Sequence, residues 1–299
     1  MMKNYFIHMR PHSFIPSFFL AFSGYACSSV KPDTFSLVLG HMAIIFGVYS
    51  ILLFGGTAAL NTAFDGESDG KPLNYLDHPP SNPKHLGLFG LFLMVLAVFI
   101  SYFLGTLVFY ASLFILLLSI LYSARLGKIP RGKEVGGLDS VINSLGCGFA
   151  SLFFGHALAG GAFDMRFFMI CVAFTLSVWG SYPATQIYQL EPTDNYARAK
   201  NYSTLLGPSL ALRLGSIFFA VAVFIIGYIL WEDQYIHYFQ IGELVLYAAF
   251  GSIYLFAAVK VFRWAKNPYE NSKNKLETLL KTLFLGRICW IIAEWVRWA

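Results

Sequence analysis

Three polar side chains recur at every fourth position where a long apolar run ends. Asn61, Asp65 and Asp69 follow the run from His41 to Leu60, which contains no Asp, Glu, Lys or Arg. In a helix, residues four positions apart lie on one face, so these side chains would form one polar stripe. Carboxylate and amide oxygens suit Mg²⁺, which proteins often bind with one or two carboxylates and the phosphates of a substrate. The spacing therefore indicates a site for Mg²⁺ and a phosphorylated substrate.

The same stretch also fits a solvated helix end followed by a turn. Gly66, Ser68, Gly70 and Pro72 are residue types that favour turns. An isolated pair of aspartates at this spacing does not separate the two interpretations, because short motifs also match by chance. The elements around the stretch have to decide between them.

The composition is that of a polytopic membrane protein. The 299 residues are 57% hydrophobic and 12% charged, with a mean hydropathy of +0.60. A soluble domain carries roughly 25% charged residues, about twice as many. The four cysteines lie in apolar runs without a C-x-x-C pair, which favours packing over metal binding.

Nine apolar stretches approach the roughly 20 residues that cross a bilayer as a helix. The 39 residues from Leu86 to Ala124 would form a helix of about 59 Å, too long for one span, so we expect a break at Gly105. We therefore expect an all-α protein of about nine transmembrane helices that forms one domain over residues 1–299. The expected spans are 14–29, 37–60, 86–104, 106–124, 141–159, 167–187, 205–231, 242–262 and 279–298.

Basic residues are distributed unequally between the two ends of these spans. With nine spans, the N-terminus and the loops after even-numbered spans share one side, and the other side has little beyond Lys31, Arg166 and Arg297. Because cytoplasmic loops are enriched in Lys and Arg, we expect the basic side, with the N-terminus, to be cytoplasmic. The long polar loops fall there too, so we expect function on that face. The net charge of +5 then reflects topology, and nucleic-acid binding is not indicated.

The loop after the fourth span concentrates positive charge. Four cations lie within nine residues: Arg125, Lys128, Arg131 and Lys133. One interpretation is that they pair with the oxygens of a polyphosphate. The alternative is that they only set topology or attract anionic lipid.

The end of the sixth span again places polar residues after an apolar run. Pro192 disturbs a helix, so the acids near it are expected at or past the helix end. Asp139 and Asn143, at the start of the fifth span, are expected either to begin that helix or to order the basic loop. The polar residues of the later cluster are Gln186, Gln189, Glu191, Asp194, Arg198 and Lys200.

The chain resembles the UbiA superfamily of intramembrane prenyltransferases over essentially its whole length. The stripe of Asn61, Asp65 and Asp69 is similar to the first aspartate-rich motif of that family, at the end of the second span. Further matching pieces are Arg10-Pro11, Tyr122-Ser123, Gly137-Leu138-Asp139, Lys200 and Thr204-Leu-Leu-Gly207. Two features depart from the family: the second motif is usually D-x-x-x-D, and Ala124-Arg125 stands where prolines commonly follow Tyr-Ser.

The resemblance implies a helical bundle with a central cavity open to the cytoplasmic side. It also implies a prenyl-transfer reaction. Family members bind an allylic isoprenyl diphosphate through Mg²⁺ held by two acidic motifs, then transfer the prenyl group to an acceptor, here a lipophilic one. The metal ligands implied for this chain are Asp65, Asp69, Glu191 and Asp194, and the diphosphate ligands are Asn61, Arg125, Lys128 and Lys200.

The chemistry explains why such a site belongs in a membrane. Ionising an allylic diphosphate requires the negative charge of the leaving group to be stabilised. Water would trap the allylic cation, so the site must be dry. Aromatic faces stabilise cations, and Tyr122 and Tyr188, one beside each motif, are the catalytic candidates alongside Asp65 and Asp69.

Two other functions stay open at the level of sequence. A terpene cyclase on the same scaffold would ionise the same diphosphate and close a ring without an acceptor. A transporter would use the acids as a cation-coupling site. It would predict inverted repeats and broken helices near the middle of the membrane, whereas no internal repeat is evident and the acids cluster at one face.

Overall fold

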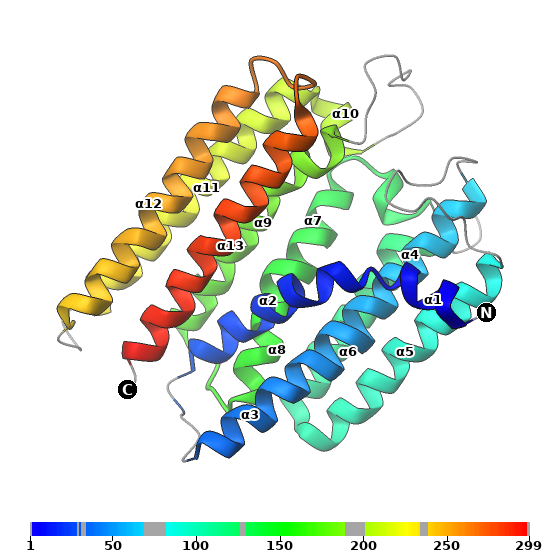
Figure 1. Ribbon diagram of the computed structural model, residues 1–299, viewed down its shortest axis with the longest axis horizontal. Helices are drawn as coiled ribbons and strands as arrows, with labels where there is room; N and C mark the ends of the chain where they lie inside the picture. The colour runs from blue at the N-terminus through cyan, green and yellow to red at the C-terminus, as the bar shows by residue number, and fades with distance from the viewer. Residues whose placement is uncertain are drawn as a thin grey trace. The chain divides into compact units, whose positions relative to one another are not determined.

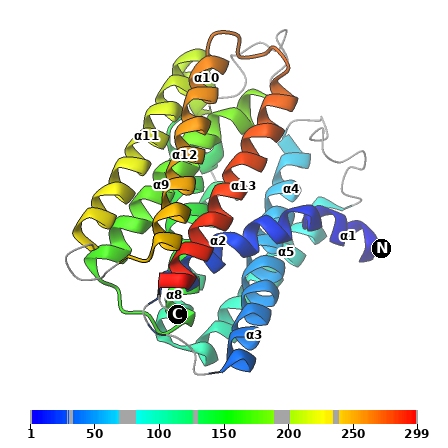
Figure 2. The ribbon, with the colours of Figure 1, turned by 60° about the vertical axis from the view of Figure 1, so that its left-hand side comes forward.

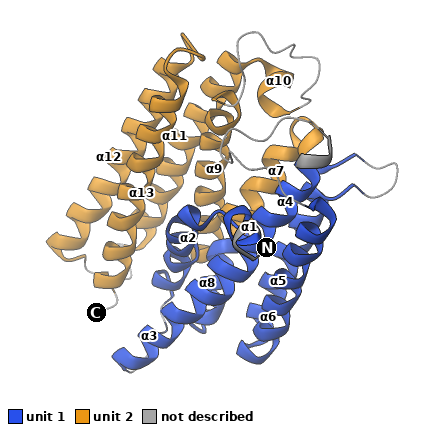
Figure 3. Cartoon of the chain, turned by 45° about the vertical axis from the view of Figure 1, so that its right-hand side comes forward, with its two compact units in different colours: residues 1–132, 150–161 blue, residues 133–149, 162–299 orange. Residues whose placement is uncertain are grey.

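The computed structural model describes residues 2–28, 30, 34–68, 82–125, 130–188, 201–233 and 239–297, and all regular structure in these ranges is helical. The chain folds as two compact units, coloured separately in Figure 3. The first unit comprises residues 1–132 and 150–161, and the second comprises residues 133–149 and 162–299.

The first unit contains the N-terminal helices and the first acidic motif. Its elements are α1 (Met2–His8), η1 (Pro11–Ser13), α2 (Phe14–Ala26), α3 (Phe35–Ile44), the π-helical η2 (Ile45–Phe54), α4 (Gly55–Ser68), α5 (Pro83–Leu104), α6 (Thr106–Ser123) and α8 (Ser151–Leu158). α4 packs along α5, and α3, η2 and α4 continue one another (Figure 2). The apolar core beneath α4 contains Met9, Phe14, Ala59, Ala63 and Leu86.

The second unit contains four long helices that pack side by side. Its elements are η3 (Gly132–Glu134), α7 (Leu138–Ser144), η4 (Leu145–Ala150), α9 (Met165–Ile187), α10 (Tyr202–Leu206), α11 (Pro208–Asp233), α12 (Ile241–Trp264) and α13 (Ser272–Arg297). The first residue of η3 and the last residue of η4 belong to the first unit. α9 packs on α11, α11 on α12, and α12 on α13 (Figure 1). The α9–α11 contact requires small residues, because a Cβ on Gly215 would lie 2.4 Å from the carbonyl oxygen of Gly180.

Seven helices in the described part of the chain are long and apolar enough to cross a membrane, which confirms the all-helical polytopic fold. They are Phe35–Asp65, Pro83–Leu104, Thr106–Ser123, Leu138–Leu158, Met165–Ile187, Pro208–Asp233 and Ile241–Trp264. The two remaining expected spans correspond to α2, which has only 13 residues, and to α13, which has 26 residues but several charges. The break between α5 and α6 lies at Gly105, as expected. Gly105 has a φ of 140°, a backbone conformation that glycine adopts much more readily than other residues.

One end of the four-helix group is joined by buried charges. Arg166 on α9 donates from Nε to Asp233 on α11 (3.1 Å) and from a terminal nitrogen to Glu294 on α13 (2.8 Å). Arg297 also donates to Asp233, and the hydroxyl of Tyr247 on α12 donates to Glu294 (2.9 Å). Replacing a buried ion pair with apolar residues is often neutral, whereas removing one partner is costly. The network therefore joins α9, α11, α12 and α13 at this end of the unit.

Candidate functional site

The first acidic motif lies at the end of α4, in the first unit. Asn61 and Asp65 are one helical turn apart, as their spacing predicts. The Asp65 side chain is buried, at 6% exposed for the whole residue. The Oδ1 atom of Asn61 is buried and accepts no hydrogen bond within the described residues. Asp69, the third member of the predicted stripe, lies outside the described residues.

A buried arginine faces this motif. The Arg131 guanidinium donates from a terminal nitrogen to Oδ1 of Asp65 at 3.1 Å, and both side chains are almost fully buried. The guanidinium orients this carboxylate and compensates the cost of its burial. Sequence reasoning noticed Arg131 only as one of four cations in its loop, and nothing in the spacing marks it as the partner of Asp65.

The predicted residues at the end of α6 are less enclosed. Tyr122 is half-buried and Arg125 is exposed, while Ser123 between them is fully buried with no hydrogen-bond partner for its hydroxyl in the described part of the chain. Lys128, the next predicted cation, lies outside the described residues. The end of α6 thus combines a half-buried tyrosine with an exposed arginine.

In the second unit, α9 ends where the second polar cluster begins. Tyr188 follows the last residue of α9 and is half-buried. The predicted ligands Glu191, Asp194 and Lys200 lie outside the described residues, so their assignment stays a prediction.

Asp139 and Gln186 form a buried polar network at this end of the second unit. Asp139 is fully buried and accepts hydrogen bonds from the backbone N–H of Gly137 (2.9 Å), the backbone N–H of Tyr202 (3.0 Å) and the Gln186 amide. The Gln186 carbonyl oxygen accepts in turn from the Ser203 backbone (3.1 Å) and hydroxyl (2.7 Å). Burial, followed by the charge of Asp139, raises the pKa of the Tyr202 phenol.

These bonds show what Asp139 holds. Its carboxylate accepts from the backbone N–H of Gly137, just before α7, and it also accepts from a side chain of α9 and from the backbone of α10. Sequence reasoning treated Gln186 only as a member of a polar cluster. Nothing in that cluster indicates a bond to a residue 47 positions earlier in the chain.

The chemistry of the α4 end suits a hard cation. Among the described residues no group of three or more His, Cys, Asp or Glu side chains gathers in metal-binding geometry. Two oxygen donors, the Asp65 carboxylate and the buried Asn61 amide oxygen, are nevertheless present one turn apart. Mg²⁺ commonly takes only one or two protein carboxylates and completes its shell with water and phosphate oxygens. The donors present therefore fit such an ion.

The comparison with protein families finds a match over most of the chain. The model of the UbiA prenyltransferase family matches residues 17–285. A search of the curated proteins found no match.

Solved structures share the fold across nearly the full length of both chains. A structure described as giving insights into digeranylgeranylglyceryl phosphate synthase in membranes matches with a TM-score of 0.69 and 20% identity, covering 99% of each chain. A UbiA homolog from Archaeoglobus fulgidus bound to GPP and Mg²⁺ matches with a TM-score of 0.70 and 15% identity, covering 98% of each chain. The same homolog bound to DMAPP and Mg²⁺ gives a TM-score of 0.70 at 17% identity, covering 98% of each chain.

Proposed function

The chain belongs to the UbiA prenyltransferase family, and we propose that it ionises an allylic isoprenyl diphosphate with Mg²⁺ and transfers the prenyl group to a lipophilic acceptor. The family match covers the acidic motif and most of the chain. The A. fulgidus homolog of the same fold has been solved with two isoprenyl diphosphates and Mg²⁺. These findings support the substrate class, and the acceptor is left to experiment.

The observation that carries the proposal is the buried amide oxygen of Asn61 beside Asp65, which accepts no hydrogen bond from any residue that the structure describes. A buried acceptor without a hydrogen bond costs free energy, and binding an ion or a water molecule there is one way to recover it. A cation or its bound water would satisfy this oxygen and the Asp65 carboxylate together. The proposal adds Asp69, Glu191 and Asp194 as further metal ligands.

The remaining residues bind, orient and shield the substrate. When bound, Mg²⁺ would neutralise part of the charge on the diphosphate leaving group. Arg125, Lys128 and Lys200 hold the other diphosphate oxygens, and Arg131 holds the Asp65 carboxylate in its orientation. The faces of Tyr122 and Tyr188 stabilise the allylic cation. The apolar helices exclude the water that would otherwise capture it.

The most direct variant is Asn61→Leu. Leucine has nearly the same shape and leaves no donor unsatisfied, so thermal stability in detergent should stay unchanged or rise. Mg²⁺-dependent release of pyrophosphate should fall by at least about tenfold, the lower end of what altered metal surroundings cost. Full turnover by a well-folded Asn61→Leu protein would refute the assignment of this oxygen.

The reaction itself is tested with purified protein, Mg²⁺ and allylic diphosphates of three chain lengths. Pyrophosphate release and extracted products are followed with and without a membrane-lipid extract. Release that depends on the extract, with a prenylated product in the mass spectrum, supports transfer. A cyclic product made without the extract would show that the protein is a cyclase and not a transferase. Asp65→Asn should abolish either reaction.

A further inference from the structure

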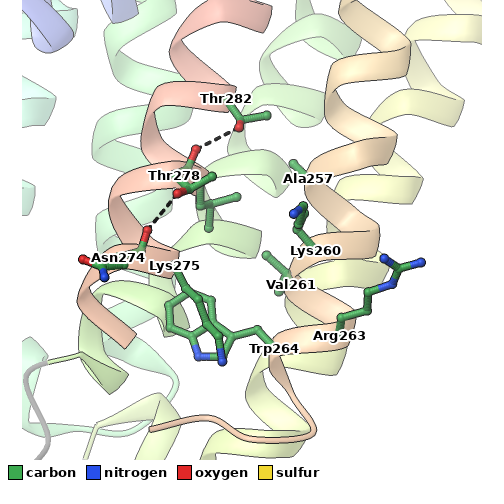
Figure 4. A pocket seen from close by; sticks show the side chains of 10 residues that line it. Ala257, Lys260, Val261, Arg263, Trp264, Asn274, Lys275, Thr278 and Thr282 are labelled. Carbon is green, nitrogen blue, oxygen red and sulfur yellow. Dashed lines mark hydrogen bonds between the residues drawn. The ribbon is translucent and has the colours of Figure 1, made fainter. Parts of the chain in front are cut away.

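A pocket of about 350 Å³ lies between α12 and α13, within the second unit (Figure 4). Its apolar lining comes from Ala257 and Val261 on α12 and Leu279 on α13. Three cationic side chains also line it: Lys260, Arg263 and Lys275. A concave surface that combines aliphatic side chains with exposed cations at its edge suits an amphipathic anion.

The turn that joins α12 and α13 holds two of the side chains that line this pocket. Trp264, only 4% exposed, donates its indole N–H to the carbonyl oxygen of Pro268 at 2.6 Å. The Lys275 ammonium donates to the carbonyl oxygen of Asn267 at 3.3 Å and lies 3.9 Å from a carboxylate oxygen of Glu270. The indole wall is therefore held in place, and Lys275 is partly neutralised.

The other polar groups of the pocket differ in how far they are satisfied. The hydroxyls of Thr278 and Thr282 donate to backbone carbonyls one turn earlier on α13, both at 2.8 Å (Figure 4). The Lys260 ammonium lies 5.1 Å from the centre of the Phe256 ring. Within the described residues, neither Lys260 nor Arg263 has a carboxylate within ion-pair distance. The positive charge of the pocket is thus unbalanced.

The surroundings place these cations at a membrane interface. α12 is one of the helices able to cross a membrane, and Lys260 and Arg263 lie within its last five residues. Phe256, Val259 and Phe262 on the same helix are about half exposed, as side chains that face lipid are. Basic side chains near the ends of such helices extend toward the headgroups. A lipid phosphate is the anion that is abundant at this depth.

We propose that this pocket binds an anionic glycerophospholipid. Its phosphate is held by Lys260 and Arg263, with Lys275 alongside, and an acyl chain lies against Ala257, Val261 and Leu279. Basic pockets between transmembrane helices bind anionic headgroups by this combination of charge and apolar contact. The site shares no residue with the proposed diphosphate site, so the lipid is a resident ligand of the α12–α13 pair and not a substrate.

The test compares lipid retention by native mass spectrometry. Purified protein in detergent is titrated with phosphatidylglycerol and with phosphatidylcholine of the same acyl chains. Wild-type protein should retain phosphatidylglycerol preferentially. The variant Lys260→Gln/Arg263→Gln should lose affinity for it by about fivefold per cation removed. Binding of phosphatidylcholine and the melting temperature should stay unchanged.

The matched control is Lys266→Gln/Lys273→Gln, which removes the same charge from exposed positions near the same helix ends, outside the pocket. An equal loss of phosphatidylglycerol affinity in the control would show that general surface charge causes the effect, and would overturn the pocket assignment. Equal retention of the two lipids by wild type would do the same. Displacement of phosphatidylglycerol by millimolar glycerol phosphate would indicate a soluble-anion site and refute the lipid, whereas its failure to compete supports the acyl contact.

Discussion

At the scale of single residues, the Asp65–Arg131 pair determines how the acidic motif is held. Both side chains are buried, and the guanidinium lies 3.1 Å from the carboxylate. Arg131→Met should lower the free energy of unfolding by about 3 kcal/mol or more, because removing one partner leaves an uncompensated charge. Thermal melting in detergent measures this, with exposed Lys84→Met as the control. Restored stability in Asp65→Asn/Arg131→Met relative to the single variants would establish the pairing, and strictly additive losses would contradict it.

The sequence predicts that Asn61 and Asp65 lie together, but it does not predict that Arg131 is the partner of Asp65. Asn61 and Asp65 share a helix, so their spacing alone places them together. Arg131 reaches Asp65 across 66 residues of chain, and choosing it from four neighbouring cations requires the path of the loop. The unsatisfied oxygen of Asn61 is also a property of packing, since no sequence pattern tells which donors lie near a buried amide.

At the scale of elements, Asp139 and Gln186 join α7, α9 and α10. Gln186→Leu removes the acceptor for the backbone N–H of Ser203, which is fully buried. A lost hydrogen bond of about 1 kcal/mol should speed amide exchange there by about fivefold. Hydrogen–deuterium exchange over residues 202–206 measures the change. Asn143→Ala, one turn along α7 from Asp139, is the control, and unchanged exchange in Gln186→Leu would show that the network does not anchor α10.

Local signals mark helix boundaries, but the sequence analysis used only one of them, the break at Gly105, and expected α9 to begin at 167 and not at Met165. Gly105 ends α5 because its backbone conformation disfavours other residues, and Asp164 begins α9 by accepting from the Phe167 N–H at 2.7 Å. The sequence predicts a span at 279–298, which corresponds to α13, but not the partners of the charges in it. Glu294 pairs with Arg166 on α9, and Arg297 pairs with Asp233 on α11. Hydropathy treats such residues singly, so a partner on another helix cannot enter the prediction.

At the scale of the whole molecule, the distribution of basic residues predicts which membrane face each helix end meets. α5 has 22 residues, a length of about 33 Å, and so spans a bilayer core once. Its first turn carries Lys84, and Thr106 stands just beyond its other end; both are exposed. Because cytoplasmic ends are rich in Lys and Arg, we expect Lys84 inside the cell and Thr106 outside.

Single cysteines at these two positions test the orientation, in a background whose four native cysteines are replaced by alanine. An impermeant maleimide added to intact cells should label Thr106→Cys and leave Lys84→Cys unlabelled until the cells are lysed. The cysteine-free background must stay unlabelled in both conditions. The reverse pattern would place the α4 end, and with it Asn61 and Asp65, on the outer face. A cytoplasmic supply of diphosphate substrate would then be excluded, which makes this result decisive for how the enzyme obtains its substrate.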